Sequence, residues 1–306
     1  MSIAFLFAGQ GAQYVGMGKD FYDVCPNVKE LYDTLQMDFD VKDVCFNGPK
    51  EKLQDTAYTQ CCIVATSLAI ANVLTQKGIK PDYVAGLSLG EYSALTYAGV
   101  FDLDTVLPLV RTRGLTMAHA LDHKETMMAA VLKGQVEEIE QICKQVSDEN
   151  EICTIANYNS PKQIVITGDK SAVTHASQLL KEKGCKVLPL AVSGAFHSSL
   201  LEQAAQSFHK ELEKCMYHKM NIPVVFNVSG QEETGSIVEL LTRQMHSSVR
   251  FYQSIEYMIA KGVDTFIEIG PGKVLGKLVK QTSSDVKVYS IDTLEDLKTM
   301  LEEYHG

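Results

Sequence analysis

The sequence predicts an α/β protein in which a parallel-sheet core is interrupted by a smaller α+β subdomain. Short apolar runs alternate with helical segments near both ends of the chain, which is typical of parallel βαβ units. In the middle the order changes to strand, helix, strand, strand, helix, strand, the ferredoxin-like unit. We therefore expect a core of residues 1–124 and 193–306 and an insert of residues 125–192. A cleft between the two parts is the expected place for an active site.

The core elements before the insert follow from apolar runs bounded by glycine turns. A first strand ends in the loop "AGQGAQ", and a second strand leads directly into a helix. The expected elements are strands at 3–7 and 83–85 and helices at 60–77, 91–98 and 103–120.

The insert contains two amphipathic helices between short apolar strands. Ile139, Ile142 and Val146 recur at helical spacing in the first helix, and Gly184 closes the second. The expected insert strands are 126–132, 151–159, 162–168 and 185–192, and its helices are 136–146 and 170–184. After the insert, we expect a strand at 222–230, a strand, Gly-Pro-Gly turn and helix over 263–281, and a last strand at 286–291.

Composition narrows the class of protein. The chain has 306 residues and a net charge of −10, so a general nucleic-acid role is not expected. Its eight cysteines form no Cys-x-x-Cys pair and are read as reduced thiols. The N-terminal apolar run is too short for a signal peptide, and no stretch is expected to approach transmembrane length. We expect a cytoplasmic protein without a membrane partner.

One serine stands out, Ser88 in "GLSLG". The motif lies between a short buried strand and a helix, where a sharp turn projects the corner side chain and glycines let the backbones approach. The helix N-terminus also favours developing negative charge. Ser88 is therefore a candidate nucleophile, with an ordinary tight turn as the alternative.

His197 is the candidate base. It follows the last insert strand in "GAFHS", at the junction of the two parts, although an ordinary loop histidine explains the pattern equally well. His119 and His123 are four residues apart, as in some metal sites, but no third ligand is evident and a solvated helix face is favoured. No metal site is predicted. No aspartate or glutamate stands out as a third member of a triad, and a carbonyl group is an alternative partner for the imidazole.

A glycine loop after the first strand and a pair of arginines are two further candidates for the site. The loop Gly9-Gln10-Gly11 places a backbone N–H near Ser88, or it is a plain strand-end turn. The dinucleotide pattern G-x-G-x-x-G is not met, because residue 14 is Tyr. Arg111 and Arg113, in "VRTRG", point to different sides of a helix. One of them is a candidate for binding a carboxylate, although spacing alone favours a surface arginine.

An ordered set of motifs connects these residues. It consists of "FAGQGAQYVGMG", "GLSLGEYSAL", "VRTRG", "IANYNSPKQIVITG", "GAFHS", "RQM" and "IEIGPGKVLGKLVK". With this set the chain resembles the malonyl-CoA:acyl-carrier-protein transacylases of bacterial fatty-acid synthesis and the acyltransferase domains of polyketide synthases. The resemblance covers nearly the whole chain. It implies an α/β-hydrolase-like core with a ferredoxin-like insert.

The resemblance also implies roles for particular residues. Ser88 matches the acyl-accepting nucleophile and His197 the base. Gln244 matches the residue whose main-chain carbonyl orients the histidine in place of an acid. The other implied roles are the backbone N–H donors of the oxyanion hole at Gln10 and Leu89, the malonyl carboxylate partner at Arg113, and a residue selecting malonyl over methylmalonyl at Phe196. Two residues depart from the family pattern, Leu87 where His is usual and Ala8 where Pro is usual.

The implied reaction is a ping-pong transfer of malonyl from malonyl-CoA through Ser88 to the thiol of holo acyl carrier protein, by a monomer that needs no cofactor. Three alternatives are a trans-acting malonyltransferase of a polyketide assembly line, a serine thioesterase or esterase, and a non-enzymatic docking module for the carrier protein. Arg113 and the absence of an evident triad acid argue against the hydrolase.

Overall fold

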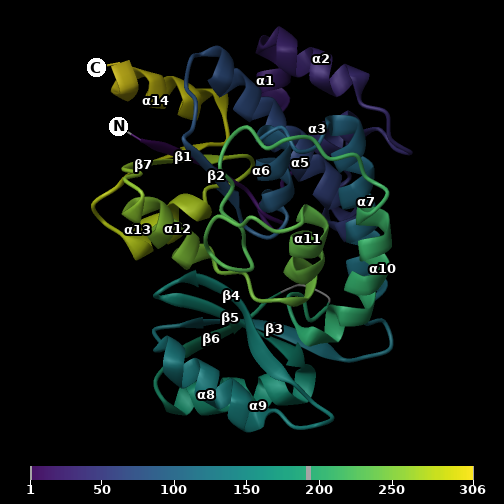
Figure 1. The fold of residues 1–306 in the computed structure, drawn as a ribbon, viewed down its shortest axis with the longest axis vertical. Helices are drawn as coiled ribbons and strands as arrows, with labels where there is room; N and C mark the ends of the chain where they lie inside the picture. Colours follow the sequence, from purple (N-terminus) through teal and green to yellow (C-terminus); the bar gives the residue numbers. More distant parts are fainter. Residues whose placement is uncertain (1, 191–193, 306) are drawn as a thin grey trace. The chain divides into compact units, whose positions relative to one another are not determined.

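Two compact units make up the protein in a computed structural model, which describes residues 2–190 and 194–305 (Figure 1). Unit 1 comprises Met1–Gly114, Cys215–Val225 and Tyr257–Gly306, and unit 2 comprises Leu115–Lys214 and Phe226–Glu256. The expected insert, 125–192, falls inside unit 2, which extends beyond it on both sides. Its expected C-terminal limit falls within 191–193, outside the described residues, and the insert boundaries stay a prediction.

Unit 1 is built on a four-stranded sheet of order β2-β1-β7-β8, in which every pairing is parallel. All residues of the two central strands are buried, as expected for a sheet covered on both faces. The parallel sheet confirms the predicted fold class. The strands are β1 (Ile3–Phe7), β2 (Tyr83–Gly86), β7 (Thr265–Ile269) and β8 (Lys287–Ile291).

The helices of unit 1 include four between residues 19 and 54 that the apolar pattern did not predict. Its helices are α1 (Lys19–Val24), α2 (Pro26–Thr34), α3 (Val41–Asn47), α4 (Lys50–Gln54), α5 (Thr56–Gln76), α6 (Gly90–Tyr97), α13 (Leu275–Thr282) and α14 (Leu294–His305). Two helices, α7 (Leu103–His119) and α12 (Phe251–Ala260), run from one unit into the other.

Helix α5 corrects one expectation from the sequence. It is long and apolar enough to cross a membrane, whereas no stretch was expected to reach that length. Because 89% of its most apolar window is buried inside the structure, the same composition fits a core helix. The helix also starts four residues earlier than expected, since the Asp55 carboxylate accepts a hydrogen bond from the Ala57 N–H at 2.9 Å and caps it.

Unit 2 contains an antiparallel sheet of order β4-β5-β3-β6. This is the strand order of a ferredoxin-like unit, with α8 and α9 packed on one face (Figure 1). Its strands are β3 (Thr126–Leu132), β4 (Cys153–Ser160), β5 (Gln163–Asp169) and β6 (Lys186–Pro189), and its helices are α8 (Val136–Val146), α9 (Lys170–Glu182), η1 (Ser199–Leu201), α10 (Glu202–Leu212) and α11 (Ile237–His246).

The strand expected at 222–230 is not a continuous strand. Val224 forms an isolated parallel bridge with Val84, and Phe226 pairs in the antiparallel sense with Gln231. The chain reverses direction at Gly230, whose φ is 75°. The apolar run therefore forms two separate short pairings, one at Val224 and one at Phe226. The boundary between the units falls between these two residues, after Val225.

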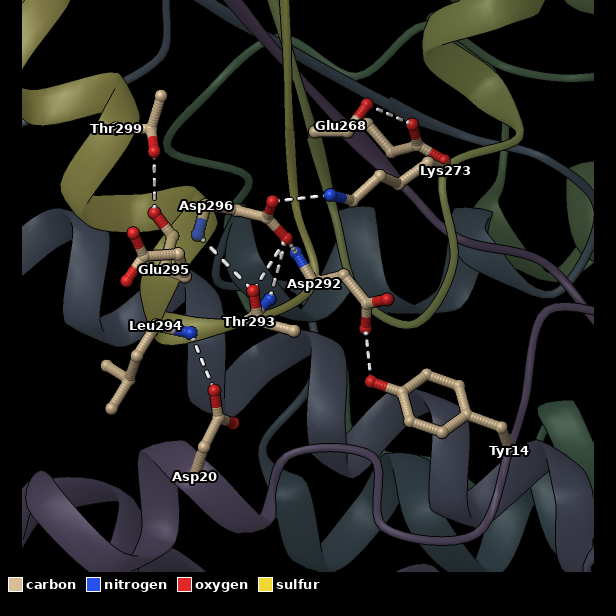
Figure 2. A network of polar contacts seen from close by, with 11 residues as sticks. Tyr14, Asp20, Glu268, Lys273, Asp292, Thr293, Leu294, Glu295, Asp296 and Thr299 are labelled. Atoms are coloured by element: carbon tan, nitrogen blue, oxygen red, sulfur yellow. Dashed lines mark hydrogen bonds and ion pairs between the residues drawn. The ribbon is translucent and has the colours of Figure 1, made fainter.

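A polar network ties the loop after β1 to the segment after β8 (Figure 2). The Tyr14 hydroxyl donates to the Asp292 carboxylate at 2.9 Å. Asp296 accepts from the backbone N–H groups of Thr293 and Asp292, at 3.0 and 3.3 Å, and forms an ion pair with Lys273. Burial raises the pKa of Asp292, and the neighbouring Asp296 adds to the shift. The network anchors the loop after β1 at Tyr14.

Candidate active site

Ser88 lies on the sharp turn between β2 and α6, and its backbone is strained. Its φ is 52°, and Ser88, Lys133 and His197 are the three non-glycine residues with positive φ in the described part of the chain. A Cβ on Gly86 would lie 2.0 Å from the Gly90 carbonyl carbon, and a Cβ on Gly90 would lie 2.1 Å from the Phe7 carbonyl oxygen. Glycine is therefore required on both sides of Ser88, as the motif predicted.

Two backbone N–H groups beside this turn are available as donors. Within the described residues, neither Gln10 nor Leu89 donates its backbone N–H to another group. Leu89 is the residue before the first turn of α6, where N–H groups have no partner within the helix. The Gln10 loop approaches so closely that a Cβ on Gly9 would lie 2.5 Å from the Leu87 carbonyl oxygen. An oxyanion hole needs such preorganised donors.

The two departures from the family pattern have backbone roles here. The Leu87 N–H donates to the Phe7 carbonyl at 3.3 Å, and its own carbonyl faces Gly9. The Ala8 N–H donates to the Ile269 carbonyl at 3.1 Å and extends the pairing of β1 with β7. A proline at position 8 has no N–H and would lose this bond.

Arg113 is a buried cation in contact with the candidate nucleophile. Its side chain is 1% exposed, and its Nη2 donates to Ser88 Oγ at 3.2 Å. The guanidinium carbon lies 5.2 Å from the centre of the Tyr92 ring. Burial lowers the pKa of Arg113, while Tyr92 and Glu91 act in the opposite direction. A cation held out of water beside a hydroxyl is suited to bind a carboxylate on the reacting acyl group.

Packing of α7 against the start of α5 explains why the second arginine of "VRTRG" reaches Ser88. A Cβ on Gly114 would lie 2.6 Å from the Thr56 carbonyl oxygen, so glycine allows the two helices to touch. Arg111 points elsewhere, with Nη1 on the Ala57 carbonyl at 3.0 Å and Nη2 on Asp38 at 2.9 Å. Arg111 is therefore a structural residue.

Gln60 is a residue of the site that the sequence reasoning missed. It is fully buried on α5, and its Oε1 accepts from Arg113 Nη1 at 3.1 Å. Its Nε2 donates to the Gln10 side chain at 3.3 Å, and Gln10 in turn donates to Thr56 at 3.1 Å. Its helix also contains Gln76 and several hydroxyl side chains, so the local sequence gave no signal that singled out Gln60. Gln60 links the arginine to the loop of the candidate oxyanion hole.

Unit 2 carries the candidate base. His197 is 4% exposed, and its Nδ1 lies 2.9 Å from the main-chain carbonyl oxygen of Gln244. Gln244 is in the last turn of α11, where carbonyl groups have no N–H partner within the helix. A carbonyl only accepts, so Nδ1 carries the proton and Nε2 has the lone pair of a general base. The Ser198 hydroxyl, bonded to the Ala195 carbonyl at 2.7 Å, stabilises the same turn.

Phe196 is buried next to His197 in the same segment. Its ring lies over Gly194, where a Cβ would come within 2.7 Å of the ring carbon Cε1. Gly194 has a φ of 120°, which other residues rarely adopt. Glycine at this position therefore leaves room for the Phe196 ring.

Two other histidines, His119 and His218, have carboxylate partners. His119 Nδ1 lies 3.0 Å from Asp122, and His218 Nε2 lies 3.1 Å from Asp102. Over residues 2–190 and 194–305, no group of three or more His, Cys, Asp or Glu side chains is placed to hold a metal ion.

The predicted residues fall into two sets. Unit 1 brings together Ser88, Arg113 and the loops of Gln10 and Leu89, and unit 2 brings together His197, Gln244 and Phe196. The first set offers a nucleophile, oxyanion donors and a cation, and the second offers a base of fixed tautomer. These are the groups that acyl transfer needs.

Fold and site define an acyl-transferring enzyme. The chain belongs to the acyl transferase domain family, whose sequence profile matches residues 4–298. It is 41% identical over 305 residues to the malonyl CoA-acyl carrier protein transacylase of Bacillus subtilis, covering 98% of this chain and 96% of that one. These findings confirm the family resemblance and the enzyme class predicted from the motifs.

Solved structures agree with this assignment. The crystal structure of malonyl CoA-acyl carrier protein transacylase from Clostridium perfringens has a TM-score of 0.96 and 41% identity, over 100% of this chain and 98% of that chain. A malonyl transacylase in complex with the acyl carrier protein of a type II polyketide synthase has a TM-score of 0.94 and 36% identity, over 99% of this chain and all of that one.

Proposed function

We propose that this enzyme transfers the malonyl group from malonyl-CoA to the pantetheine thiol of holo acyl carrier protein and thereby supplies fatty-acid synthesis. The observation that carries the proposal is the 3.2 Å contact between Arg113 Nη2 and Ser88 Oγ. An acyl group bound to Ser88 has its far end near a buried guanidinium. A free carboxylate at that end pairs with the guanidinium in a bidentate manner, whereas an acetyl group leaves the buried charge without this partner.

The first half-reaction forms the acyl-enzyme. In the proposed mechanism His197 Nε2 takes the proton of Ser88, and Oγ attacks the thioester carbonyl. The backbone N–H groups of Gln10 and Leu89 stabilise the oxyanion of the tetrahedral intermediate. The C–S bond then breaks, the proton moves from His197 to the sulfur, and CoA leaves as the thiol.

The second half-reaction reverses these steps with a different thiol. The thiol of the carrier protein gives its proton to His197 and attacks the malonyl ester on Ser88. The C–O bond breaks, and Ser88 recovers its proton. The Gln244 carbonyl keeps the same imidazole tautomer throughout, since Nδ1 stays protonated in both halves.

Three further properties belong to the proposal. The two half-reactions exchange only an acyl group and a proton, so no cofactor is needed. We assign the enzyme to the cytoplasm, in keeping with its eight free cysteines, and we propose that it acts as a monomer without a nucleic-acid or membrane partner. Phe196 is proposed to favour malonyl over methylmalonyl by occupying the space of an α-methyl group.

A second candidate differs only in the carrier protein. In this candidate the enzyme serves a polyketide assembly line in trans. It is supported by the similar structure of a malonyl transacylase bound to a polyketide carrier protein. The chemistry at Ser88 is the same in both cases.

Intact-mass analysis after mixing with malonyl-CoA tests the proposal. We expect a malonyl adduct on the wild-type chain, none on Ser88→Ala, and movement of the adduct onto added holo carrier protein. Rapid release of free malonate with the carrier present would instead identify a hydrolase. Carrier proteins of fatty-acid and polyketide synthesis, supplied in competition, separate the two candidates by which one accumulates the malonyl group.

A further inference from the structure

Unit 2 contains a polar cavity of about 550 Å³ beside the candidate base. It is formed by the start of β4 and the residues before it, the turn at His197, and the end of α11 with the segment that follows. We call it the Arg243–Arg250 pocket. Its lining is Ser147, Ile152, Cys153, Thr154, His197, Ser198, Ser199, Val228, Arg243, His246, Ser247, Ser248 and Arg250.

The charge of this pocket is opposite to that of the whole chain. The lining contains two arginines and no carboxylate, although the chain has 38 acidic residues against 28 Lys and Arg. Neither Arg243 nor Arg250 forms an ion pair within 4.0 Å with a carboxylate of the described residues. By contrast, Arg111 in unit 1 is paired with Asp38. Two arginines facing one cavity without an acid are suited to bind an anion.

The helix dipole explains only part of this arrangement. Arg243 and His246 are three residues apart in the last turn of α11, where basic residues complement the negative end of a helix. Arg250 lies beyond the end of α11, so the helix dipole does not account for its position. Its backbone N–H donates to the Asn227 carbonyl at 2.8 Å, and its guanidinium lies 5.3 Å from the centre of the Tyr158 ring. These contacts hold Arg250 at the pocket independently of α11.

Hydroxyl groups complete the set of donors. Ser147, Ser198 and Ser248 are used by the fold, donating to the carbonyls of neighbouring segments. The side chains of Thr154, Ser199 and Ser247 make no hydrogen bond with another described residue. Guanidinium, imidazole and hydroxyl donors without a carboxylate match a tetrahedral phosphate, whereas a divalent cation requires oxygen acceptors.

We propose that the Arg243–Arg250 pocket binds a phosphate group of the pantetheine-bearing substrates. The inference rests on the proposed function, because the thiol donor and acceptor of that reaction both carry phosphate. Coenzyme A has phosphate in its nucleotide part, and a holo carrier protein has a phosphodiester at the base of its arm. The pocket therefore distinguishes phosphorylated from unphosphorylated pantetheine compounds.

Calorimetric binding of coenzyme A and of pantetheine, which lacks phosphate, tests the pocket without requiring catalysis. Wild type is expected to bind coenzyme A more tightly than pantetheine. Arg243→Ala is expected to reduce this preference about 10- to 150-fold, the range for losing a hydrogen bond to a charged group. Arg243→Lys restores part of it. Lys181→Ala, which removes an exposed lysine of α9 outside the pocket, serves as the matched control.

Steady-state transfer then identifies the source of the phosphate. A raised KM for malonyl-CoA alone assigns the pocket to the nucleotide phosphates, and a raised KM for both malonyl-CoA and holo carrier protein assigns it to the phosphate at the base of the arm, which both substrates carry. The inference is overturned if folded Arg243→Ala keeps the wild-type ratio of coenzyme A to pantetheine affinity, or if both ligands weaken equally. If wild type shows the preference but forms no adduct on Ser88, the proposed function fails while the phosphate site stands.

Discussion

Replacing Gln60 by alanine tests whether the buried polar chain of unit 1 sets the choice of substrate. Gln60 Oε1 accepts from Arg113 Nη1 at 3.1 Å, and both side chains are buried. A hydrogen bond to a charged group contributes about 1.5–3 kcal/mol. If that energy serves to orient Arg113 toward the substrate carboxylate, kcat/KM for malonyl-CoA falls about 10- to 150-fold.

The assay compares formation of the acyl-enzyme from malonyl-CoA and from acetyl-CoA by rapid quench and mass spectrometry. Acetyl has no carboxylate for Arg113, so its rate should change much less than the malonyl rate. Gln60→Glu should be worse for malonyl, because a carboxylate 3.1 Å from Arg113 occupies the charge that malonyl needs.

Gln76→Ala is the matched control, since Gln76 is an exposed glutamine on the same helix. It should leave both rates unchanged. Circular dichroism establishes that each variant is folded. Equal losses for malonyl and acetyl in Gln60→Ala would refute the reasoning, because they would show a general structural defect in place of a lost orientation of the cation.

Three other predictions follow from the contacts described above. Gly90→Ala places a Cβ 2.1 Å from the Phe7 carbonyl oxygen, so it should lower the free energy of unfolding by about 1–3 kcal/mol and abolish acylation. Gly235→Ala, where no atom lies within 4 Å of the new Cβ, is the control and should change neither the melting temperature nor the amount of adduct. Burial raises the pKa of Asp296, but hydrogen bonds from Lys273, Thr293 and the Asp292 N–H together outweigh this effect and hold the pKa below its usual range. A lowered carboxyl pKa stabilises the fold at pH values above the unfolded pKa, so Asp296→Asn should reduce the melting temperature at pH 7. The difference should disappear as the pH falls through the lowered pKa of Asp296, and a difference that stays constant with pH would contradict the assignment. Phe196→Ala should increase methylmalonyl adduct relative to malonyl in mass spectra, and an unchanged ratio would remove its proposed role.

Much of the candidate site was predictable because its sequence signals are local. The glycines on both sides of Ser88 reflect backbone contacts within a few residues and with the end of β1. The alternation of strands and helices likewise predicted both sheets, including the ferredoxin-like strand order. Short-range periodicity and turn chemistry are the parts of a fold that a single sequence displays most directly.

Contacts between distant segments were not predictable in the same way. Arg111 and Arg113 look alike in sequence, and the close packing at Gly114 decides which one reaches Ser88. Gln60 has partners 50 and 53 residues away, so no local pattern reveals its role. The contribution of Gln244 is a main-chain carbonyl, which every residue has, and only the family resemblance indicated it.

Helices and strands whose stability depends on their neighbours were also missed. The four short helices between residues 19 and 54 are five to nine residues long and depend on packing, since isolated helices of this length are unstable. The apolar run at 222–230 resembled a strand, but only Val224 finds a partner in the parallel sheet, because the chain leaves unit 1 after Val225.

The most direct test of the account is a competition between malonyl-CoA and acetyl-CoA at equal concentration, with the adduct on Ser88 identified by intact mass. The central claim is that Arg113, 3.2 Å from Ser88 Oγ, selects an acyl group with a free carboxylate. Wild type should carry almost only malonyl, and Arg113→Ala should lose that preference or favour acetyl. A malonyl preference that survives unchanged in folded Arg113→Ala would contradict the claim.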